Sequence, residues 1–199
     1  MGEVNALDRR AVVAELLRDR GGLLVVSGLG SPSYDVMAAG DHDLNFYLWA
    51  AMGSAAMMGL GLAAARPERP VLVLTGDGEM LMGLGSLATI ALRRPRNLSI
   101  VVLDNGHFGE TGMQESHTGR GIELTRVAEA CGFPAVDMVT GMEGVEPLRA
   151  RVHECDGLNF AAVKIGAVNV PRVLPPRDGV YVKNRFRAAL GSSTNQCQD

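Results

Sequence analysis

The sequence has few cysteines and no excess of basic residues, and each scarcity excludes a class of protein. The three cysteines, Cys131, Cys155 and Cys197, form no CxxC pair. Cysteines so spaced encode neither a disulfide framework nor a thiolate zinc site, and we expect a reducing, cytoplasmic location. The 19 Lys and Arg residues are matched by 22 Asp and Glu residues, for a net charge of -3. This balance indicates no surface for nucleic acid.

A secretion signal is also missing from the sequence, and only one stretch is long enough to be weighed as a membrane span. Glu3 and Asp8 stand where a signal peptide would carry basic residues. Residues 46–65 form an uncharged run of 20 residues, which could cross a bilayer. Its glycines and seven alanines make the run only weakly hydrophobic. We therefore expect a buried helix packed against a sheet, and no contact with a membrane.

Strands and helices are expected to alternate along the chain. Runs of β-branched residues and leucine, typical of buried parallel strands, predict strands at 23–27, 71–75, 98–104, 135–139 and 160–165. Apolar periodicity and small-residue runs predict helices at 7–20, 53–65, 79–93, 123–130 and 143–154. This order indicates a doubly wound α/β fold, with a mainly parallel sheet and helices on both faces. We expect one domain over residues 1–166 and a C-terminal tail over 167–199, which docks on a partner or is partly disordered.

A GDG turn lies at the carboxyl end of one predicted strand. Gly76 and Gly78 allow a tight turn and the close approach of a ligand, and the amides that start the next helix favour an anion. Asp77 brings a carboxylate beside that anion, which requires a cation between them. Asn105 follows the next strand, 28 residues after Asp77, so both side chains should emerge at the same edge of the sheet. Carboxylate and amide oxygens are hard ligands, and they predict a magnesium site.

These motifs carry a resemblance to a known family. GDG at 76–78 followed by DNGH at 104–107 resembles the metal and diphosphate signature of thiamine diphosphate enzymes. The segment WAAMGSAAMMGLGLA at 49–63 resembles the stretch that precedes this signature in acetolactate synthases and other 2-oxo acid decarboxylases. Over about residues 20–165 the sequence most resembles sulfopyruvate decarboxylase β subunits and the matching C-terminal part of phosphonopyruvate decarboxylases. One departure is Asp104, where the family usually has asparagine.

The resemblance implies the thiamine diphosphate-binding fold, two cofactors and a set of site residues. Thiamine diphosphate and Mg²⁺ are the implied cofactors, with Asp77, Asn105 and the carbonyl of His107 as metal ligands. Met52 would hold thiamine diphosphate in its bent conformation, and the carbonyl of Ala50 would accept a hydrogen bond from the aminopyrimidine. The further expected cofactor contacts are Ser31, Ser33, Gly76, Gly78, Glu79, Met80, His107, Phe108 and Gly109.

Several of these residues have a simpler interpretation. Ser31 and Ser33 are also typical turn formers, and Glu79 also complements a helix dipole. Met52 could be one more core methionine among ten. In the polar loop after Asn105, His117 is a candidate for proton transfer or for binding a substrate carboxylate, or else a solvated loop histidine.

A dinucleotide cofactor is the other candidate that the sequence raises. GLGSPS at 28–33 imitates a dinucleotide-binding loop after a first strand. Its third glycine is replaced by serine, and no strand ends in an acid about 20 residues later, so NAD is not favoured.

The expected function is that of one half of a split enzyme. In the resembled enzymes a glutamate on a separate pyrimidine-binding domain completes the cofactor chemistry, and 199 residues leave no room for that domain. We expect the diphosphate-binding subunit of a decarboxylase for a sulfopyruvate- or phosphonopyruvate-like 2-oxo acid, active with a partner subunit in an α2β2 or larger assembly. The alternatives are a carboligase subunit of the acetolactate synthase type and a non-catalytic cofactor-binding or regulatory subunit.

Overall fold

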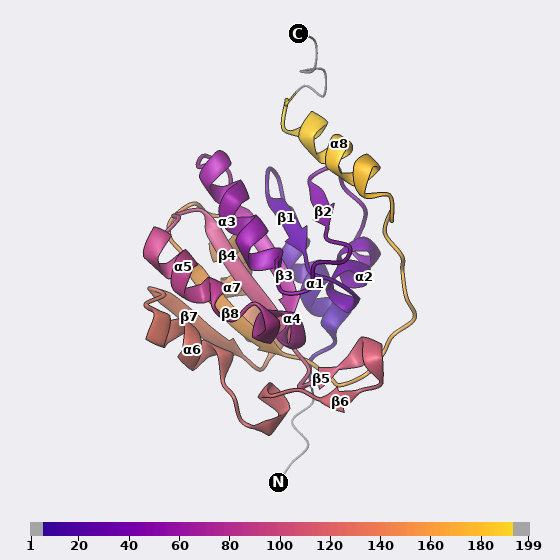
Figure 1. Cartoon of the computed structure of the whole chain (residues 1–199), viewed down its shortest axis with the longest axis vertical. Helices are drawn as coiled ribbons and strands as arrows, with labels where there is room; N and C mark the ends of the chain where they lie inside the picture. Colours follow the sequence, from indigo (N-terminus) through magenta and orange to yellow (C-terminus); the bar gives the residue numbers. More distant parts are fainter. Residues whose placement is uncertain (1–5, 193–199) are drawn as a thin grey trace.

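The computed structural model describes residues 6–192 and is built around a six-stranded parallel sheet (Figure 1). Its strands are β1 (Leu24–Ser27), β2 (Asn45–Tyr47), β3 (Val71–Gly76), β4 (Leu98–Asp104), β7 (Ala135–Val139) and β8 (Asn159–Lys164). They pair in the order β2-β1-β3-β4-β8-β7, and all of these pairings are parallel. The predicted fold class is therefore confirmed.

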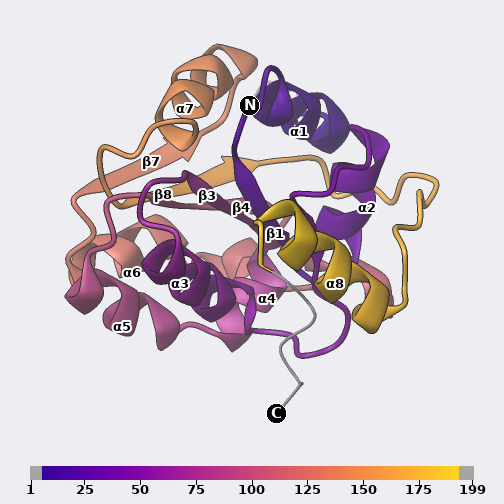
Figure 2. The ribbon, with the colours of Figure 1, turned by 90° about the horizontal axis from the view of Figure 1, so that it is seen from above.

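Helices cover both faces of this sheet, as the view from above shows (Figure 2). One face carries α1 (Arg9–Leu17), α2 (Ser31–Ala38) and α7 (Val145–Val152). The other face carries α3 (Ala55–Ala65), α4 (Asp77–Met82), α5 (Ser86–Arg93), α6 (Leu124–Cys131) and α8 (Gly179–Ala189). The sheet is thus the middle of three layers.

The long strands are apolar at successive positions because they are buried on both faces. Along β3, Val71 and Val73 belong to one hydrophobic core, whereas Leu72 and Leu74 belong to the other. Successive side chains of a strand point to opposite faces, so each core takes alternate residues. The prediction of these strands from continuous apolar runs is therefore confirmed.

The small residues of α3 let this helix lie close to the sheet. A Cβ atom on Gly59 would lie 2.2 Å from Val73 Cγ2, so the close approach of α3 to β3 requires glycine there. Only Ala55–Ala65 of the uncharged run are helical, and its first residues belong to β2. Within residues 6–192, the helices are too short or too polar to span a membrane. A cytoplasmic location stays a prediction.

The helix predicted at 79–93 is in fact two helices. α4 ends at Met82 and α5 begins at Ser86. Between them the backbone of Gly83 meets the loop before α3, because a Cβ atom on Gly83 would lie 2.2 Å from the carbonyl oxygen of Gly53. A continuous helix carrying a side chain at this position could not pack there.

Outside the polar loop after Asn105, three helices or strands were not predicted: α2, β2 and α8. The last of these lies in the segment expected to be a tail, and it packs against the edge strand β2. The ring of Phe186 meets Phe46 edge-on with 5.7 Å between centroids, and Arg185 donates to both carboxylate oxygens of Asp41 at 2.7 and 3.1 Å. Docking of the tail on a partner stays a prediction, and Cys197 lies outside the described residues. Cys131 and Cys155 are free.

The polar loop predicted at 105–121 contains short elements of its own. A two-stranded antiparallel hairpin joins β5 (His107–Phe108) to β6 (Gln114–Glu115), with a 3-10 turn at Gly109–Thr111 between them. A second 3-10 turn follows at Thr118–Arg120. The hairpin lies beyond the carboxyl end of β4 (Figure 1).

Candidate functional site

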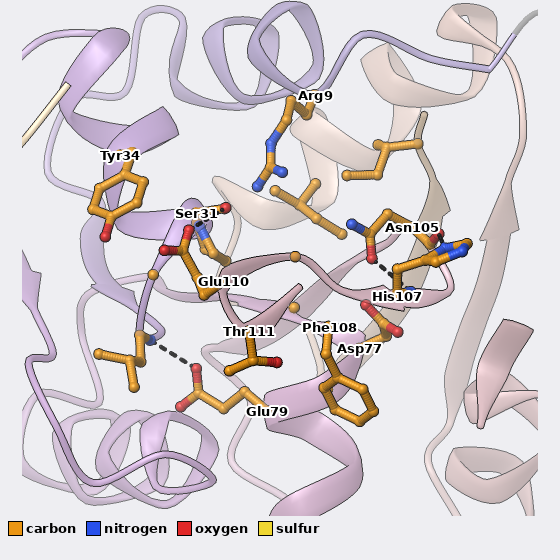
Figure 3. Close-up of a pocket in the computed structure, with 18 of the residues that line it drawn as sticks. Arg9, Ser31, Tyr34, Asp77, Glu79, Asn105, His107, Phe108, Glu110 and Thr111 are labelled. Carbon is orange, nitrogen blue, oxygen red and sulfur yellow. Dashed lines mark hydrogen bonds between the residues drawn. The ribbon is translucent and has the colours of Figure 1, made fainter. Parts of the chain in front are cut away.

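A cavity of about 320 Å³ lies at the carboxyl edge of the sheet (Figure 3). This is the edge where β1, β3 and β4 end, and the chain moves to opposite sides of β1 when it forms β2 and then β3. Such a switch in strand order leaves a crevice in which α/β proteins bind ligands. The lining comprises residues 29–32, 76–79 and 107–111, together with Arg9, Tyr34, Met52, Leu103, Asn105 and Ile165.

Asp77 lines this cavity from the junction of β3 and α4. Its side chain is buried, and Oδ2 accepts hydrogen bonds from Ser116 Oγ and, at 3.0 Å, from Thr118 Oγ1. Burial raises the pKa of the Asp77 carboxyl, the Ser116 hydrogen bond opposes this rise, and the charge of Asp104 adds to it. A buried carboxylate in such surroundings is well suited to a cation.

Asn105 and His107 enter the same cavity from the end of β4, and Figure 3 shows them beside Asp77. The Asn105 side-chain oxygen accepts from the backbone amide of His107 at 2.9 Å. The backbone oxygen of Asn105 lies 2.8 Å from His107 Nδ1. These two contacts fix the turn after β4, and the three residues predicted to bind the metal all line this cavity.

Asp104, the neighbour of Asn105, is turned away from the cavity. Its Oδ1 accepts from the Gly106 amide at 3.0 Å and from Thr118 Oγ1 at 2.7 Å. Its Oδ2 forms an ion pair with Lys164 Nζ, which lies opposite on β8. The charge of Asp104 is therefore balanced outside the cavity.

Gly78 and Glu79 shape the floor of the site. A Cβ atom on Gly78 would lie 2.7 Å from the ring of Phe108, so glycine allows the hairpin to close over the GDG turn. Glu79 is buried and accepts from the backbone amides of Leu29 at 2.8 Å and Ala55 at 3.3 Å. Burial raises the pKa of the Glu79 carboxyl. Glu79 thus connects the loop after β1 to the start of α3.

Met52 is not a core methionine, because it lines the cavity and its exposed fraction is 37%. It follows two residues with positive φ, Ala50 at 61° and Ala51 at 52°. Left-handed backbone at two successive alanines is strained, and such strain is often found at functional sites. Ala50 itself does not line the cavity.

The sequence of this chain also matches a known protein family. Residues 32–173 match the thiamine pyrophosphate enzyme family, C-terminal TPP binding domain, where TPP is thiamine diphosphate. The chain belongs to this family. The family resemblance that was based on the two sequence motifs is confirmed.

Some of the similar proteins are about twice as long as this chain, and others have nearly its length. A phosphonopyruvate decarboxylase from Streptomyces viridochromogenes is 40% identical over 93% of this chain and 45% of that protein. A sulfopyruvate decarboxylase from Methanosarcina acetivorans is 37% identical over 84% of this chain and 43% of that protein. The chain therefore spans less than half the length of these two relatives. The β subunit of sulfopyruvate decarboxylase from Methanothermobacter thermautotrophicus is 40% identical over 86% of this chain and 89% of that subunit.

Solved structures show the same fold. The benzoylformate decarboxylase of Polynucleobacter necessarius superposes with a TM-score of 0.65 over 83% of this chain and 34% of that protein. Its sequence is 19% identical, so the likeness concerns the fold alone.

The residues of the cavity fit the diphosphate end of the family's cofactor. The buried Asp77 and the Asn105 amide are hard oxygen ligands at one end, and glycine at positions 76 and 78 keeps space beside them. Within residues 6–192 there is no group of three His, Cys, Asp or Glu side chains that could hold a metal. A metal here would therefore need amide, carbonyl and diphosphate oxygens as well, as the family motif implies.

Besides Ala50, three predicted site residues do not reach the cavity. Ser33 is buried and donates its hydroxyl to the Gly28 carbonyl at 2.8 Å, whereas Ser31 does line the cavity. Met80 lies in the hydrophobic core with an exposed fraction of 2%. His117 is exposed and does not line the cavity, and its catalytic role stays a prediction. Gly76, Phe108 and Gly109 line the cavity as expected.

Sequence reasoning missed Arg9 and Tyr34, which also line the cavity. It also did not reveal the contacts of Glu110, which lies in the polar loop after Asn105. Glu110 accepts from Ser31 Oγ at 3.1 Å and from Arg172 at 2.8 Å. These contacts join segments far apart in the chain, so no local motif could have shown them.

Proposed function

We propose that this chain binds thiamine diphosphate together with Mg²⁺ and forms the diphosphate-binding part of a 2-oxo acid decarboxylase. The observation that supports it best is the convergence of Asp77, Asn105 and His107 in one cavity at the switch point of the sheet. In this proposal the Asp77 carboxylate, the Asn105 side chain and the His107 carbonyl hold the metal ion. A cation held there would offset the repulsion between the buried carboxylate and the diphosphate.

Other residues orient the cofactor and shape the site. Ser31, at the first turn of α2, would bind the diphosphate, and Met52 would support the bent conformation of the cofactor. Glu79 keeps the loops that carry them in place through its contacts with Leu29 and Ala55. When bound, thiamine diphosphate supplies a nucleophilic carbon for the 2-oxo group and accepts the electrons released with carbon dioxide. The hairpin at 107–115 covers the GDG turn and limits the access of water to it.

We further propose that a partner subunit supplies the pyrimidine-binding domain and its glutamate, with a sulfopyruvate- or phosphonopyruvate-like acid as substrate. Relatives of matching length are named β subunits, and the relatives named whole decarboxylases are about twice as long. Ligand sites commonly form at domain interfaces, and an α2β2 assembly is the simplest arrangement.

The test is carbon dioxide release from 3-sulfopyruvate, phosphonopyruvate and pyruvate. Each acid is assayed with the chain alone and with a candidate partner, taken from the neighbouring gene or co-purified, in the presence of Mg²⁺ and thiamine diphosphate. We expect release from a sulfonated or phosphonated acid only when both subunits are present. Release by the chain alone would contradict the split enzyme. Carbon–carbon bond formation with a second oxo acid would identify a carboligase, and bound cofactor without turnover of any acid would identify a non-catalytic subunit.

A further inference from the structure

A buried arginine from α1 extends into the proposed cofactor cavity. Arg9 has an exposed fraction of 5% and is one of the residues that line this cavity. Figure 3 shows its side chain running from α1 towards the middle of the site. Its Nε donates to Asp35 Oδ2 at 2.6 Å, and its two terminal nitrogens form no hydrogen bond with any residue of 6–192. The two terminal nitrogens are not among the fully buried atoms that lack a partner, so they are open to the cavity, where an anion would accept hydrogen bonds from them.

The charges of the residues around the cavity also favour a role for Arg9 in binding an anion. Asp77, Glu79 and Glu110 are acidic side chains that line it, and among the lining residues Arg9 is the sole lysine or arginine. Diphosphate brings more negative charge than one divalent cation can neutralise once the Asp77 carboxylate is counted. The Arg9 guanidinium, although paired with Asp35 through Nε, would bring donors and positive charge to the cavity, and its planar fork matches phosphate oxygens.

Asp35 holds this guanidinium in place. It is buried on α2, the helix whose first residue Ser31 lines the same cavity. Arg9 engages Asp35 through Nε, which leaves both terminal nitrogens on the cavity side. Arg10 approaches the other carboxylate oxygen at 3.7 Å but does not line the cavity.

We propose that Arg9 binds the diphosphate of the cofactor and that Asp35 is its positioning residue. The inference rests on the proposed function, because it assumes that the cavity takes a diphosphate. Arg9 lies before residues 32–173, so the family match does not include it. The site would therefore extend from the family domain to the helix that precedes it.

The test measures binding to the full 199-residue chain, without turnover. Inorganic pyrophosphate and thiamine diphosphate are titrated by calorimetry in the presence of Mg²⁺. Arg9→Gln should weaken both affinities by roughly tenfold to a hundredfold, the range for hydrogen bonds to charged groups. Arg10→Gln removes the same charge from the same helix and should leave both affinities unchanged.

A second variant separates binding from folding. Arg9→Gln alone leaves the buried Asp35 without its counter-ion, which destabilises the fold. The double variant Arg9→Gln/Asp35→Asn replaces the ion pair by a neutral hydrogen-bonded pair, and circular dichroism should show a native fold. We expect this folded variant to bind pyrophosphate as weakly as Arg9→Gln.

Two results would contradict the proposals, and they are distinguishable. Wild-type affinity in the folded double variant would overturn the role of Arg9 but not the proposed function. A wild-type chain that binds neither pyrophosphate nor thiamine diphosphate would overturn the proposed function itself.

Discussion

Two buried carboxylates lie next to each other at the ends of neighbouring strands, yet they face different partners. Asp77 faces the cavity, whereas Asp104 faces Lys164 on the far side. They share Thr118, whose single hydroxyl proton can be donated to only one of them at a time. The difference in orientation, and not in residue type or burial, decides which carboxylate can hold a metal.

We predict that Asp77→Ala loses Mg²⁺-dependent binding of thiamine diphosphate. Affinity should fall by about a hundredfold, because the variant removes the charge that holds the cation in the cavity. Isothermal titration with Mg²⁺ present measures this loss. Asp104→Asn is the matched control, since it removes an equally buried carboxylate, leaves the half-exposed Lys164 hydrated and should keep the wild-type affinity. Equal affinities for Asp77→Ala and wild type would contradict the metal assignment.

At this scale the sequence could show which segments reach the site but not the direction of each side chain. Ser31 and Ser33 are two residues apart in the first turn of α2, where successive side chains point in different directions. Ser31 faces the cavity and Ser33 faces inward to the Gly28 carbonyl. Met80 was expected at the site from the family resemblance, but α4 turns it into the core.

At the scale of elements, α3 packs closely against β3. Gly59 lies against Val73, whereas a Cβ atom on Gly61, two residues along the same helix, would meet no atom within 4 Å. The helix therefore presents one glycine to the sheet and another to open space. Its position matters for the site, because the strained segment that carries Met52 leads directly into α3.

We predict opposite effects for two alanine substitutions in α3. Gly59→Ala should lower the free energy of unfolding by about 1–3 kcal/mol, because the new methyl group overlaps Val73. Gly61→Ala should raise it by up to about 1 kcal/mol, because alanine is the better helix former and meets no neighbour. Urea denaturation measures both. Equal changes of the same sign would show that α3 does not pack as described.

The elements that the sequence did not reveal are short or lie in segments interpreted as loops. β2 has three residues, too few for a recognisable apolar run. The start of α2 does carry a signal, because Pro32 lies in its first turn, a position that proline favours. α8 carries another, since the Asp178 side chain caps its first amides, and Val182 and Phe186 form a buried stripe one turn apart.

At the scale of the whole molecule, the cavity draws residues from nearly the entire described chain. Its lining runs from Arg9 on α1 to Ile165 after β8, and Glu110 joins it to Arg172. The two motifs that identified the family supply only its centre. Contributions from α1 and from the segment after β8 depend on how the chain folds back on itself, which no short motif encodes.

Because the cavity joins elements from both halves of the chain, its ligands should stabilise the whole fold. A ligand that binds only the folded state at about 100 times its Kd adds about 2.7 kcal/mol to the free energy of unfolding. For a chain of this size, that corresponds to a rise in Tm of roughly 5–10 °C. We predict this rise for Mg²⁺ and thiamine diphosphate together, and little change for either alone, because the buried carboxylate of Asp77 and the diphosphate repel each other unless the cation lies between them. Differential scanning calorimetry measures the Tm with each component, with both, and with both plus a chelator. If thiamine diphosphate with the chelator raised the Tm as much as thiamine diphosphate with Mg²⁺, no metal would join the cofactor to this chain.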